Sequence, residues 1–368
     1  MIIKNGIIFR EDKTFSRGDL LIEKGRIVNS ADQVTDTVEI DGTGLYVLPG
    51  LVDIHSHGAV GEDFSDNNIE GLHKILQYEF SHGITTCCPT SMTLKKEEIC
   101  KIFCKIENWQ DKEGMSHVAG INMEGPFLDP VKKGAHLEEH ILPPDIDFFR
   151  KCNKLCKNKI RLVTLAPNMD GAMDFIRELK DEVTISLGHS AADYDTAKQA
   201  FEAGACHVTH LFNAMNPLGH RAPGLIAAAA EQKGCVAELI CDGIHVHESM
   251  VRAAFKLFPG RIALISDSMR ATGMADGTYD LGGQQVHVNG KLATLSDGTI
   301  AGSATNLYDG MRNAISFGIP TEEAVAAATM VPAKSIGIFD EVGSLTPGKR
   351  ADVVLADKNL NLIRVLPL

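Results

Sequence analysis

The amino-acid sequence predicts an α/β fold: a (β/α)8 TIM barrel with a small β-sandwich domain formed from both chain termini. Two observations support this prediction. Apolar, β-prone runs alternate with helical stretches through the centre of the chain, whereas both ends consist of short strand-like runs and turns. Such alternation is typical of βαβ units and a parallel sheet. A chain of 368 residues, 44% of them hydrophobic, can bury a large core.

The small domain is predicted to comprise residues 1–48 and 340–368. Near the N-terminus, Asn5-Gly6 and Lys24-Gly25 each separate two short apolar runs, which is the pattern of β-hairpins. Residues 351–366 are again apolar and β-prone. We expect the two chain ends to form one domain, because they resemble each other and differ from the centre.

The barrel is predicted to comprise residues 49–339. Eight strand–helix units in about 290 residues fit a closed barrel. A doubly wound open sheet is the alternative, but no Gly-x-Gly-x-x-Gly follows the first run. A β-hairpin insertion near 279–300, with turns at Asn289-Gly290 and Asp297-Gly298, interrupts the alternation. The eight runs are Tyr46–His55, Thr85–Pro89, Val118–Glu124, Ile160–Pro167, Val183–His189, Cys206–Phe212, Val236–Asp242 and Ile262–Asp267.

The composition argues against several classes of function. The net charge is −12 and no lysine–arginine cluster stands out, so nucleic acid is not an expected partner. No stretch approaches the roughly 18 apolar residues of a membrane span, and the first residues lack a signal-peptide pattern. Nine cysteines without zinc-finger spacing predict reduced thiols in a cytoplasmic protein.

Histidine and carboxylate side chains stand at the ends of five of the eight runs. Barrel enzymes keep their active sites at the C-terminal ends of the strands, and these side chains are the ligands of Zn²⁺ and similar ions. Residues two apart on a strand share a face, so a His-x-His pair can point both rings into the barrel mouth. We therefore predict a site for a divalent metal cation, Zn²⁺ or Fe²⁺, with one or two ions per subunit. The residues concerned are His55, His57, Glu124, His189, His210 and Asp267.

The sequence resembles the amidohydrolase superfamily at both ends of the predicted barrel. The segment 49–58, Pro-Gly-Leu-Val-Asp-Ile-His-Ser-His-Gly, is similar to the superfamily's opening motif, and the segment 343–353 is similar to its closing motif. Further segments resemble the N-acetylglucosamine-6-phosphate deacetylases, and the likeness runs nearly end to end. These segments are Glu124-Gly125-Pro126-Phe127, Gly188-His189-Ser190, His210-Leu211-Phe212-Asn213-Ala214-Met215, Asp242-Gly243-Ile244-His245 and Ser266-Asp267.

The resemblance implies a metal-dependent hydrolase that removes the acetyl group of a phosphorylated amino sugar. It implies metal ligands at Glu124, His189 and His210, and a proton-shuttling carboxylate at Asp267. His136 matches the family residue that polarises the acetyl carbonyl and stabilises the oxyanion. Some members of the family lack the histidine pair of the first strand and hold one metal. This chain keeps the pair His55 and His57, so a second metal is expected to be possible.

The resemblance also implies how the substrate is held. Arg221 and His245 match the phosphate-binding positions, and arginine suits phosphate because its fork can donate two parallel hydrogen bonds. In the family this arginine reaches in from a neighbouring subunit, so a homodimer or homotetramer is implied. The roles of Arg270, His247 and His287 stay open, although Arg270 could also serve the phosphate. The remaining substrate-binding positions are Ala135, Asn213, Ala214, Asp242, Ala301, Gly302 and Ser303.

Three other functions stay open. Dihydroorotases and hydantoinases share the opening motif but typically carry a carboxylated lysine at the end of strand four, where this chain has Leu165-Ala166-Pro167. A deacetylase for the N-acetylgalactosamine 6-phosphate isomer is harder to exclude, because one inverted hydroxyl leaves little trace in sequence. A non-catalytic scaffold on the same fold is also possible, although such proteins usually lose metal ligands that this sequence retains.

Overall fold

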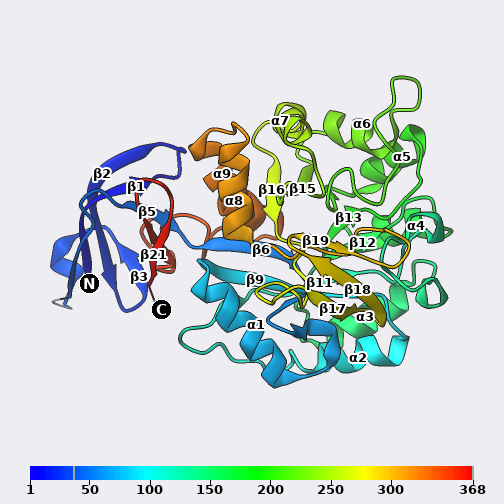
Figure 1. The fold of residues 1–368 in the computed structure, drawn as a ribbon, viewed down its shortest axis with the longest axis horizontal. Helices are drawn as coiled ribbons and strands as arrows, with labels where there is room; N and C mark the ends of the chain where they lie inside the picture. The colour runs from blue at the N-terminus through cyan, green and yellow to red at the C-terminus, as the bar shows by residue number, and fades with distance from the viewer. Residues whose placement is uncertain (36–37, 367–368) are drawn as a thin grey trace.

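The protein is described by a computed structural model that covers residues 1–35 and 38–366, and its central feature is a parallel barrel (Figure 1). The strands follow one another around the barrel in chain order. A parallel bridge between Ser56 and Ser268 closes the ring between its first and last strands. The barrel prediction is therefore confirmed, and an open sheet is excluded. The strands are β6 (Leu51–Ser56), β9 (Ile84–Ser91), β11 (Ile121–Glu124), β12 (Ile160–Leu165), β13 (Thr184–Leu187), β14 (His207–Val208), β15 (Val236–Ile240) and β16 (Ile262–Ile265).

Two of the predicted runs each divide into two strands. The first run contains β5 (Tyr46–Pro49), which belongs to another sheet, and then β6 of the barrel. The third run contains β10 (His117–Val118), which pairs with β9, and then β11. The apolar pattern continues through both breaks because each flanking strand is buried, so periodicity alone could not separate them.

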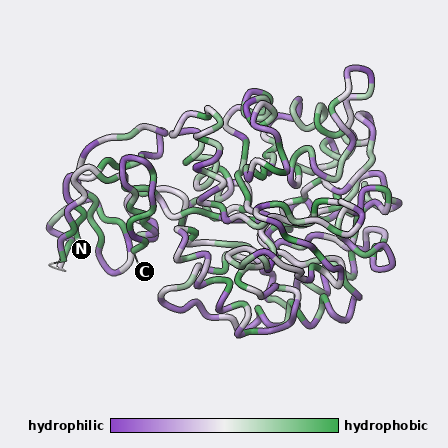
Figure 2. Tube along the Cα trace, viewed as in Figure 1, coloured by the Kyte–Doolittle hydropathy of each residue, from purple (hydrophilic) through white to green (hydrophobic). Residues whose placement is uncertain are grey.

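Helices cover the outside of the barrel and bury their apolar faces against it. In Figure 2 the hydrophilic residues lie mainly along the outer loops and helix surfaces. The helical stretch 321–335 is divided into two helices, because Pro332 has no N–H to donate to the turn before it and the chain bends at Thr329. The helices are α1 (Ile69–Ser81), α2 (Lys96–Cys104), α3 (Ile146–Leu155), α4 (Ala172–Leu179), α5 (Tyr194–Ala203), α6 (Gly224–Glu231), α7 (Glu248–Leu257), α8 (Leu307–Ser316), α9 (Thr321–Ala328) and α10 (Met330–Ser335).

Strands from both chain ends form a second sheet in the order β21-β20-β5-β1-β2-β3, with β4 pairing to β1. Blue and red strands lie together beside the barrel in Figure 1. Positions 36–37 and 367–368 of the predicted small domain lie outside the described residues. The sheet buries an apolar layer that includes Ile8, Val47 and Val353. Its strands are β1 (Ile2–Phe9), β2 (Phe15–Glu23), β3 (Arg26–Val28), β4 (Glu39–Asp41), β5, β20 (Val353–Ala356) and β21 (Leu362–Val365).

The two predicted N-terminal turns have different outcomes. Lys24-Gly25 is the turn between β2 and β3, with both residues at positive φ, as a tight hairpin requires. The hairpin at Asn5-Gly6 is wrong, because β1 continues through these residues with a register irregularity instead of turning. Gly6 lies so close to Val47 that an added Cβ would stand 2.4 Å from its methyl group. The glycine therefore serves close strand packing at this position.

The insertion is a three-stranded antiparallel sheet instead of a simple hairpin. Its strands are β17 (Gly277–Leu281), β18 (Gln284–Asn289) and β19 (Leu292–Thr294). Asn289-Gly290 turns the chain as predicted, but the first turn lies at Gly282-Gly283, which the sequence analysis did not identify. The apolar side of this sheet packs on Met92 and Ala135 near the barrel mouth. Within the described residues, no helix is long and apolar enough to cross a membrane.

Replacement of Gly50 by alanine should destabilise the junction between the two sheets. Gly50 joins β5 to β6, and an added Cβ would lie 2.1 Å from Oγ1 of the buried Thr85. Overpacking of this kind typically costs about 1–3 kcal/mol, which denaturant unfolding would measure. Gly310→Ala is the matched control, because Gly310 lies in helix α8 and, apart from its own helix backbone, no atom of the described residues lies within 4 Å of the added Cβ. Equal stability of the two variants would contradict this packing argument.

Candidate metal centre

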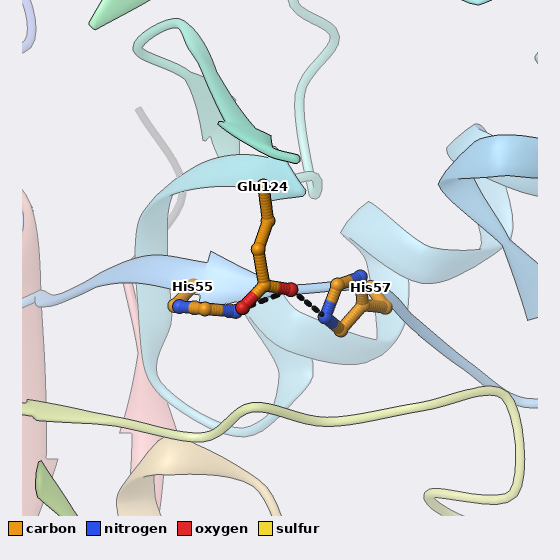
Figure 3. A group of neighbouring side chains, drawn as sticks. All are labelled: His55, His57 and Glu124. Carbon is orange, nitrogen blue, oxygen red and sulfur yellow. Dashed lines mark ion pairs between the residues drawn. The ribbon is translucent and has the colours of Figure 1, made fainter. Parts of the chain in front are cut away.

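Four histidine rings converge on the buried carboxylate of Glu124 at the end of β11, and two of them, His55 and His57, are shown in Figure 3. Its Oε2 lies 3.4 Å from Nε2 of His55 and 3.2 Å from Nε2 of His57, both on or just after β6. Its Oε1 lies 3.2 Å from Nε2 of His189 and 3.1 Å from Nε2 of His210. The fold thus brings together five residues that the sequence places at the ends of four different strands.

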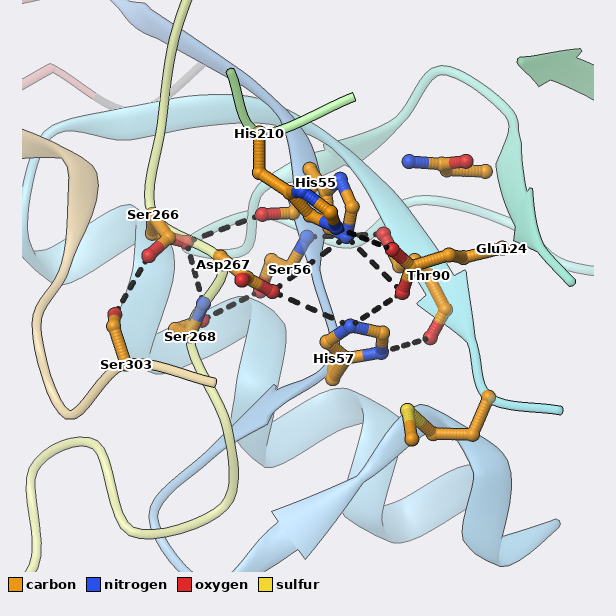
Figure 4. A network of polar contacts seen from close by, with 12 residues as sticks. His55, Ser56, His57, Thr90, Glu124, His210, Ser266, Asp267, Ser268 and Ser303 are labelled. Carbon is orange, nitrogen blue, oxygen red and sulfur yellow. Dashed lines mark hydrogen bonds and ion pairs between the residues drawn. The ribbon is translucent and has the colours of Figure 1, made fainter. Parts of the chain in front are cut away.

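Asp267 completes the cluster from the end of β16 (Figure 4). Its Oδ1 lies 3.5 Å from Nε2 of His55 and 3.4 Å from Nε2 of His57. Its backbone N–H donates to the carbonyl of His55, and its carbonyl accepts from the N–H of Ser303. The chain on both sides of Asp267 is therefore held, and its carboxylate faces the histidine rings.

Three residues of the cluster have a left-handed backbone, with φ of 46° at His189, 28° at His210 and 49° at Asp267. Residues with a Cβ rarely adopt this region, and such strain persists only where the surroundings hold it in place. Hydrogen bonds do so here: the N–H of Asp129 donates to the carbonyl of His189, and the N–H of Asn213 to that of His210. The turn at each strand end directs the side chain inwards.

Hydrogen bonds on the far side of the rings indicate which nitrogens can bind a metal. Nδ1 of His57 lies 3.2 Å from the carbonyl of Thr90, and Nδ1 of His189 lies 2.8 Å from the carbonyl of Lys132. A carbonyl only accepts, so each Nδ1 carries a hydrogen, and in the neutral ring that binds a metal each Nε2 presents its lone pair to the centre. Nε2 of His55 is buried without a hydrogen-bond partner among the described residues. This donor set fits a divalent metal cation.

In neutral His136 the hydrogen is on the other ring nitrogen than in His57 and His189. The backbone N–H of Thr93 donates to its Nδ1 over 3.2 Å, so in the neutral ring the hydrogen is on Nε2. Burial lowers the pKa of His136 to about 4, despite the nearby carboxylate of Glu124, so the ring is neutral at pH 7. Its Nε2 lies 3.5 Å from Oε2 of Glu124. Although His136 lies within reach of the same centre, its tautomer makes it a hydrogen-bond donor instead of a metal ligand.

The buried charges of the cluster shift one another's pKa values. Burial opposes ionisation of Asp267, but the charge of His55 and the hydrogen bond from His57 outweigh it and lower the pKa of Asp267 to about 2. Burial also opposes the charge on His57, yet the carboxylates of Asp267 and Glu124 raise its pKa to about 9. In the metal-free cluster, Asp267 and His57 are thus each ionised because of the opposite charges beside them.

The centre opens into a cavity of about 350 Å³. Six of the predicted substrate-binding residues line it, whereas His55 lies beneath its floor and Arg221, Asp242, Ala301 and Ser303 are outside the lining. Leu281, Thr299 and Ile300 of the insertion region form part of the wall. The six lining residues are Ala135, His136, Asn213, Ala214, His245 and Gly302.

Two of the predicted residues outside the lining, Asp242 and Ser303, help to hold residues of the site. The carboxylate of Asp242 accepts the backbone N–H of His245 and lies 2.7 Å from its Nδ1. The hydroxyl of Ser303 donates to the carbonyl of Ser266, just before Asp267. Arg221 is exposed and does not reach the cavity of its own chain.

The residues whose roles were left open have structural contacts. Arg270 donates to the carbonyl of Asp280 and to Oδ1 of Asp66, so it ties the insertion to the barrel and does not line the cavity. His247 caps α7 by accepting the N–H of Ser249. His287 lies on β18, with Nδ1 3.1 Å from the hydroxyl of Thr278.

Two contributors to the site were not among the predicted site residues. Lys132 is the only lysine or arginine among the described residues that line the cavity, and its carbonyl also orients His189. Its position four residues before His136 was the available signal. Glu238 is fully buried on β15 and contacts His55. It lies inside an apolar run, where only its charge could have drawn attention.

Comparison with known proteins agrees with this geometry. Residues 46–366 match the amidohydrolase family, and the chain belongs to that family. The N-acetylglucosamine-6-phosphate deacetylase of Bacillus subtilis (strain 168) is 38% identical over 375 residues, which cover 99% of this chain and 94% of the relative. The N-acetylgalactosamine-6-phosphate deacetylase of Escherichia coli O157:H7 is 35% identical over 322 residues, 87% of this chain and 85% of that protein.

A solved structure extends the likeness to the fold. It is a mutant N-acetyl-D-glucosamine-6-phosphate deacetylase from Mycobacterium smegmatis in complex with N-acetyl-D-glucosamine-6-phosphate. It superposes with a TM-score of 0.91 at 30% identity, over 100% of this chain and 97% of that one. The resemblance inferred from the sequence motifs is therefore confirmed.

The centre should bind a divalent metal in a way that depends on Glu124. Metal that binds only the folded state stabilises it by about 2.7 kcal/mol at a hundredfold excess over Kd. Adding Zn²⁺ or Fe²⁺ to chelator-treated protein should therefore raise the Tm by several degrees. Glu124→Gln should abolish this shift, because its carboxylate meets all four histidines. Glu202→Gln, at an exposed position of α5, is the control; an undiminished Tm shift in Glu124→Gln would remove Glu124 from the site.

Proposed function

We propose that this chain hydrolyses the N-acetyl group of N-acetyl-D-glucosamine 6-phosphate, giving D-glucosamine 6-phosphate and acetate in amino-sugar metabolism. The observation that carries the proposal is the buried cluster of imidazole nitrogens and carboxylates that opens into a cavity of about 350 Å³. Full-length relatives that bear this enzyme name support the choice of substrate. A phosphorylated amino sugar is small enough for such a cavity.

Glu124, His189 and His210 would hold one metal ion, and His55 with His57 would provide ligands for a second. The mixture of imidazole and carboxylate suits Zn²⁺ and Fe²⁺. When bound, such a metal lowers the pKa of a water ligand to about 7 and polarises the scissile carbonyl. An amide is a poor electrophile and water a poor nucleophile, so this chemistry supplies what no side chain of the site offers alone.

The side chains supply proton transfer and charge stabilisation. Asp267 takes a proton from the attacking water, because its ionised carboxylate faces the centre from the end of β16. It then delivers that proton to the leaving amine, which would otherwise depart as an unstable anion. His136 donates from Nε2 to the acetyl oxygen as negative charge develops there. The contact from the backbone N–H of Thr93 leaves the hydrogen of the neutral ring on Nε2, where this donation needs it.

The phosphate is bound by groups at the cavity mouth. His245 lines the cavity and is held by Asp242, and Lys132 adds a positive charge. Arg221 is exposed and away from its own cavity, so we propose that it enters the site of a neighbouring subunit. The protein would then act as a homodimer or homotetramer. A cytoplasmic location is proposed because the nine cysteines lack zinc-finger spacing and are all free thiols.

The galacto isomer of the substrate is the second candidate. The Escherichia coli O157:H7 relative, 35% identical to this chain, is an N-acetylgalactosamine-6-phosphate deacetylase. The two sugars differ in one hydroxyl, and both carry the acetyl and phosphate groups that the proposed contacts recognise. Discrimination between them depends on a few sugar contacts and must be measured.

The test of the proposed function is acetate release by purified protein supplied with Zn²⁺ or Fe²⁺. The substrates are N-acetylglucosamine 6-phosphate, its galacto isomer and unphosphorylated N-acetylglucosamine. Fast release from the first substrate alone is the expected result. Faster release from the galacto isomer would reverse the stereochemical assignment. Absence of release by metal-loaded protein would discard the acetyl-sugar assignment.

Asp267→Asn should abolish most of the turnover while leaving metal binding largely intact. The amide keeps the shape of the side chain but cannot accept the proton, and general acid–base catalysis typically contributes about 10²–10⁴-fold. We expect kcat to fall by that factor, measured by acetate release with metal content determined in parallel. Asp195→Asn, exposed on α5, should behave as wild type. Near-normal turnover of Asp267→Asn would remove this residue from the mechanism.

Arg221→Ala should raise KM for the phosphorylated sugar about 10- to 100-fold, because a hydrogen bond to a charged group contributes about 1.5–3 kcal/mol. KM for the unphosphorylated sugar should change little. Mixed oligomers of Arg221→Ala and Asp267→Asn subunits should regain activity, since some sites would combine an intact Asp267 with an Arg221 from the neighbour. Failure to regain activity in demonstrably mixed oligomers would place Arg221 in its own subunit's site or outside any site.

A further inference from the structure

Glu238 is a buried carboxylate for which the mechanism above has no role. It lies in the middle of β15, and its side chain has no solvent exposure. A buried carboxylate is costly unless it is paired and hydrogen-bonded. The contacts of the Glu238 side chain therefore indicate why the barrel has an acidic residue at this position.

One oxygen of Glu238 contacts two histidines of the metal centre, one from each proposed metal position. Its Oε2 lies 2.9 Å from Nδ1 of His55 and accepts the backbone N–H of His210 over 3.1 Å. The backbone carbonyl of Glu238 also accepts the N–H of Leu211. A single residue of β15 is thus bonded to His55 of β6 and to the backbone that follows β14.

The contact with Glu238 determines which ring nitrogen of His55 carries the hydrogen. Oε2 of Glu238 acts as an acceptor towards His210, so Nδ1 of His55 carries the hydrogen of their contact, and in the neutral ring that binds a metal the Nε2 lone pair faces the centre. His55 lacks the backbone carbonyl that performs this task for His57 and His189. A carboxylate that orients a metal-bound histidine also makes the ring a stronger ligand. Without Glu238, nothing described in the structure selects this tautomer of His55.

The geometry excludes Glu238 as a metal ligand. Its carboxylate meets Nδ1 of His55, on the side of the ring opposite the Nε2 that approaches Glu124. Its other oxygen, Oε1, has no hydrogen-bond partner among the described residues and lies 3.8 Å from Nδ1 of His207. The ring of His55 therefore stands between Glu238 and the centre.

We propose that Glu238 is a positioning residue that makes His55 a ligand at a second metal position. Its hydrogen bond with the backbone N–H of His210 also links the second metal position to the ligands of the first metal position. The inference rests on the metal centre of the proposed function but not on the identity of the substrate. It predicts that loss of Glu238 weakens the second metal equivalent more than the first.

Two variants separate the hydrogen bond from the charge. Glu238→Gln keeps an oxygen that can accept from both partners, whereas Glu238→Met keeps the size and removes the acceptor. Loss of such an outer contact typically weakens metal binding about 10- to 100-fold. We expect Glu238→Gln to weaken the second Zn²⁺ equivalent near the lower end of that range and Glu238→Met near the upper end or beyond. Elemental analysis and competition with a chelator of known affinity measure both equivalents.

Glu79→Gln is the matched control, because Glu79 on α1 is equally buried and no described hydrogen bond joins it to a site histidine. Both metal equivalents should bind to it as to wild type. A double-mutant cycle tests whether Glu238 acts through His55. In a His55→Asn background, Glu238→Gln should no longer alter Zn²⁺ affinity, since the amide oxygen still accepts from the N–H of His210.

The outcomes distinguish this inference from the proposed function. If Glu238→Met fails to fold, Glu238→Gln and the double-mutant cycle still test the positioning role of Glu238. A wild-type protein that takes only one Zn²⁺ per subunit would overturn the inference, as would an effect of Glu238→Gln that persists undiminished without His55. The expected metal pattern in a protein that releases no acetate would refute the proposed function and leave the role of Glu238 standing.

Discussion

The interaction on which the site depends is the burial of the Glu124 carboxylate among four histidine rings. Its two oxygens lie 3.1–3.4 Å from four Nε2 atoms. Placing a carboxylate in a protein interior is expensive unless other groups compensate its charge. The rings compensate it here, and burial in turn removes competing water from the cluster. A barrel suits this arrangement because it brings the ends of distant strands to one place.

The backbone around the cluster is strained in order to direct its side chains. His189, His210 and Asp267 all have positive φ values, and each lies where a strand gives way to a loop. The strain is balanced by hydrogen bonds from neighbouring loops and, at His210, by the carboxylate of Glu238. Preorganisation of this kind is useful for catalysis, because the groups need not be ordered again when substrate binds.

Parts of the molecule outside the barrel also support the site. The strand that carries His55 continues from β5 of the terminal sheet across Gly50, so that sheet anchors one side of the cluster. The insertion packs on Met92 and supplies Leu281 to the cavity wall. Its attachment through Arg270 explains why that arginine is unavailable to a phosphate group.

Local sequence was informative where a residue's neighbours along the chain decide its position. The sequence showed that His55 and His57 are two residues apart and therefore share a face of their strand. It also showed that Glu124 lies at a strand end. The Asn5-Gly6 dipeptide shows the limit of such reasoning, because the pattern suits a turn while the packing of Gly6 on Val47 keeps the strand continuous. Likewise, the break between β5 and β6 follows from which sheet each pairs with, and no local pattern records that choice.

The sequence by itself determined the barrel, the set of metal-type side chains at its strand ends and the family to which the chain belongs. Only the tertiary structure decided which nitrogen of His136 carries the hydrogen, that Nδ1 of His55 meets the carboxylate of Glu238, and that Arg221 lies outside the lining of its own cavity. The physical reason is that tautomers, ion pairs and cavity walls depend on contacts between residues far apart in the chain. Such contacts are set by strand register and closure of the barrel, whereas strand identity is set by neighbours a few residues away.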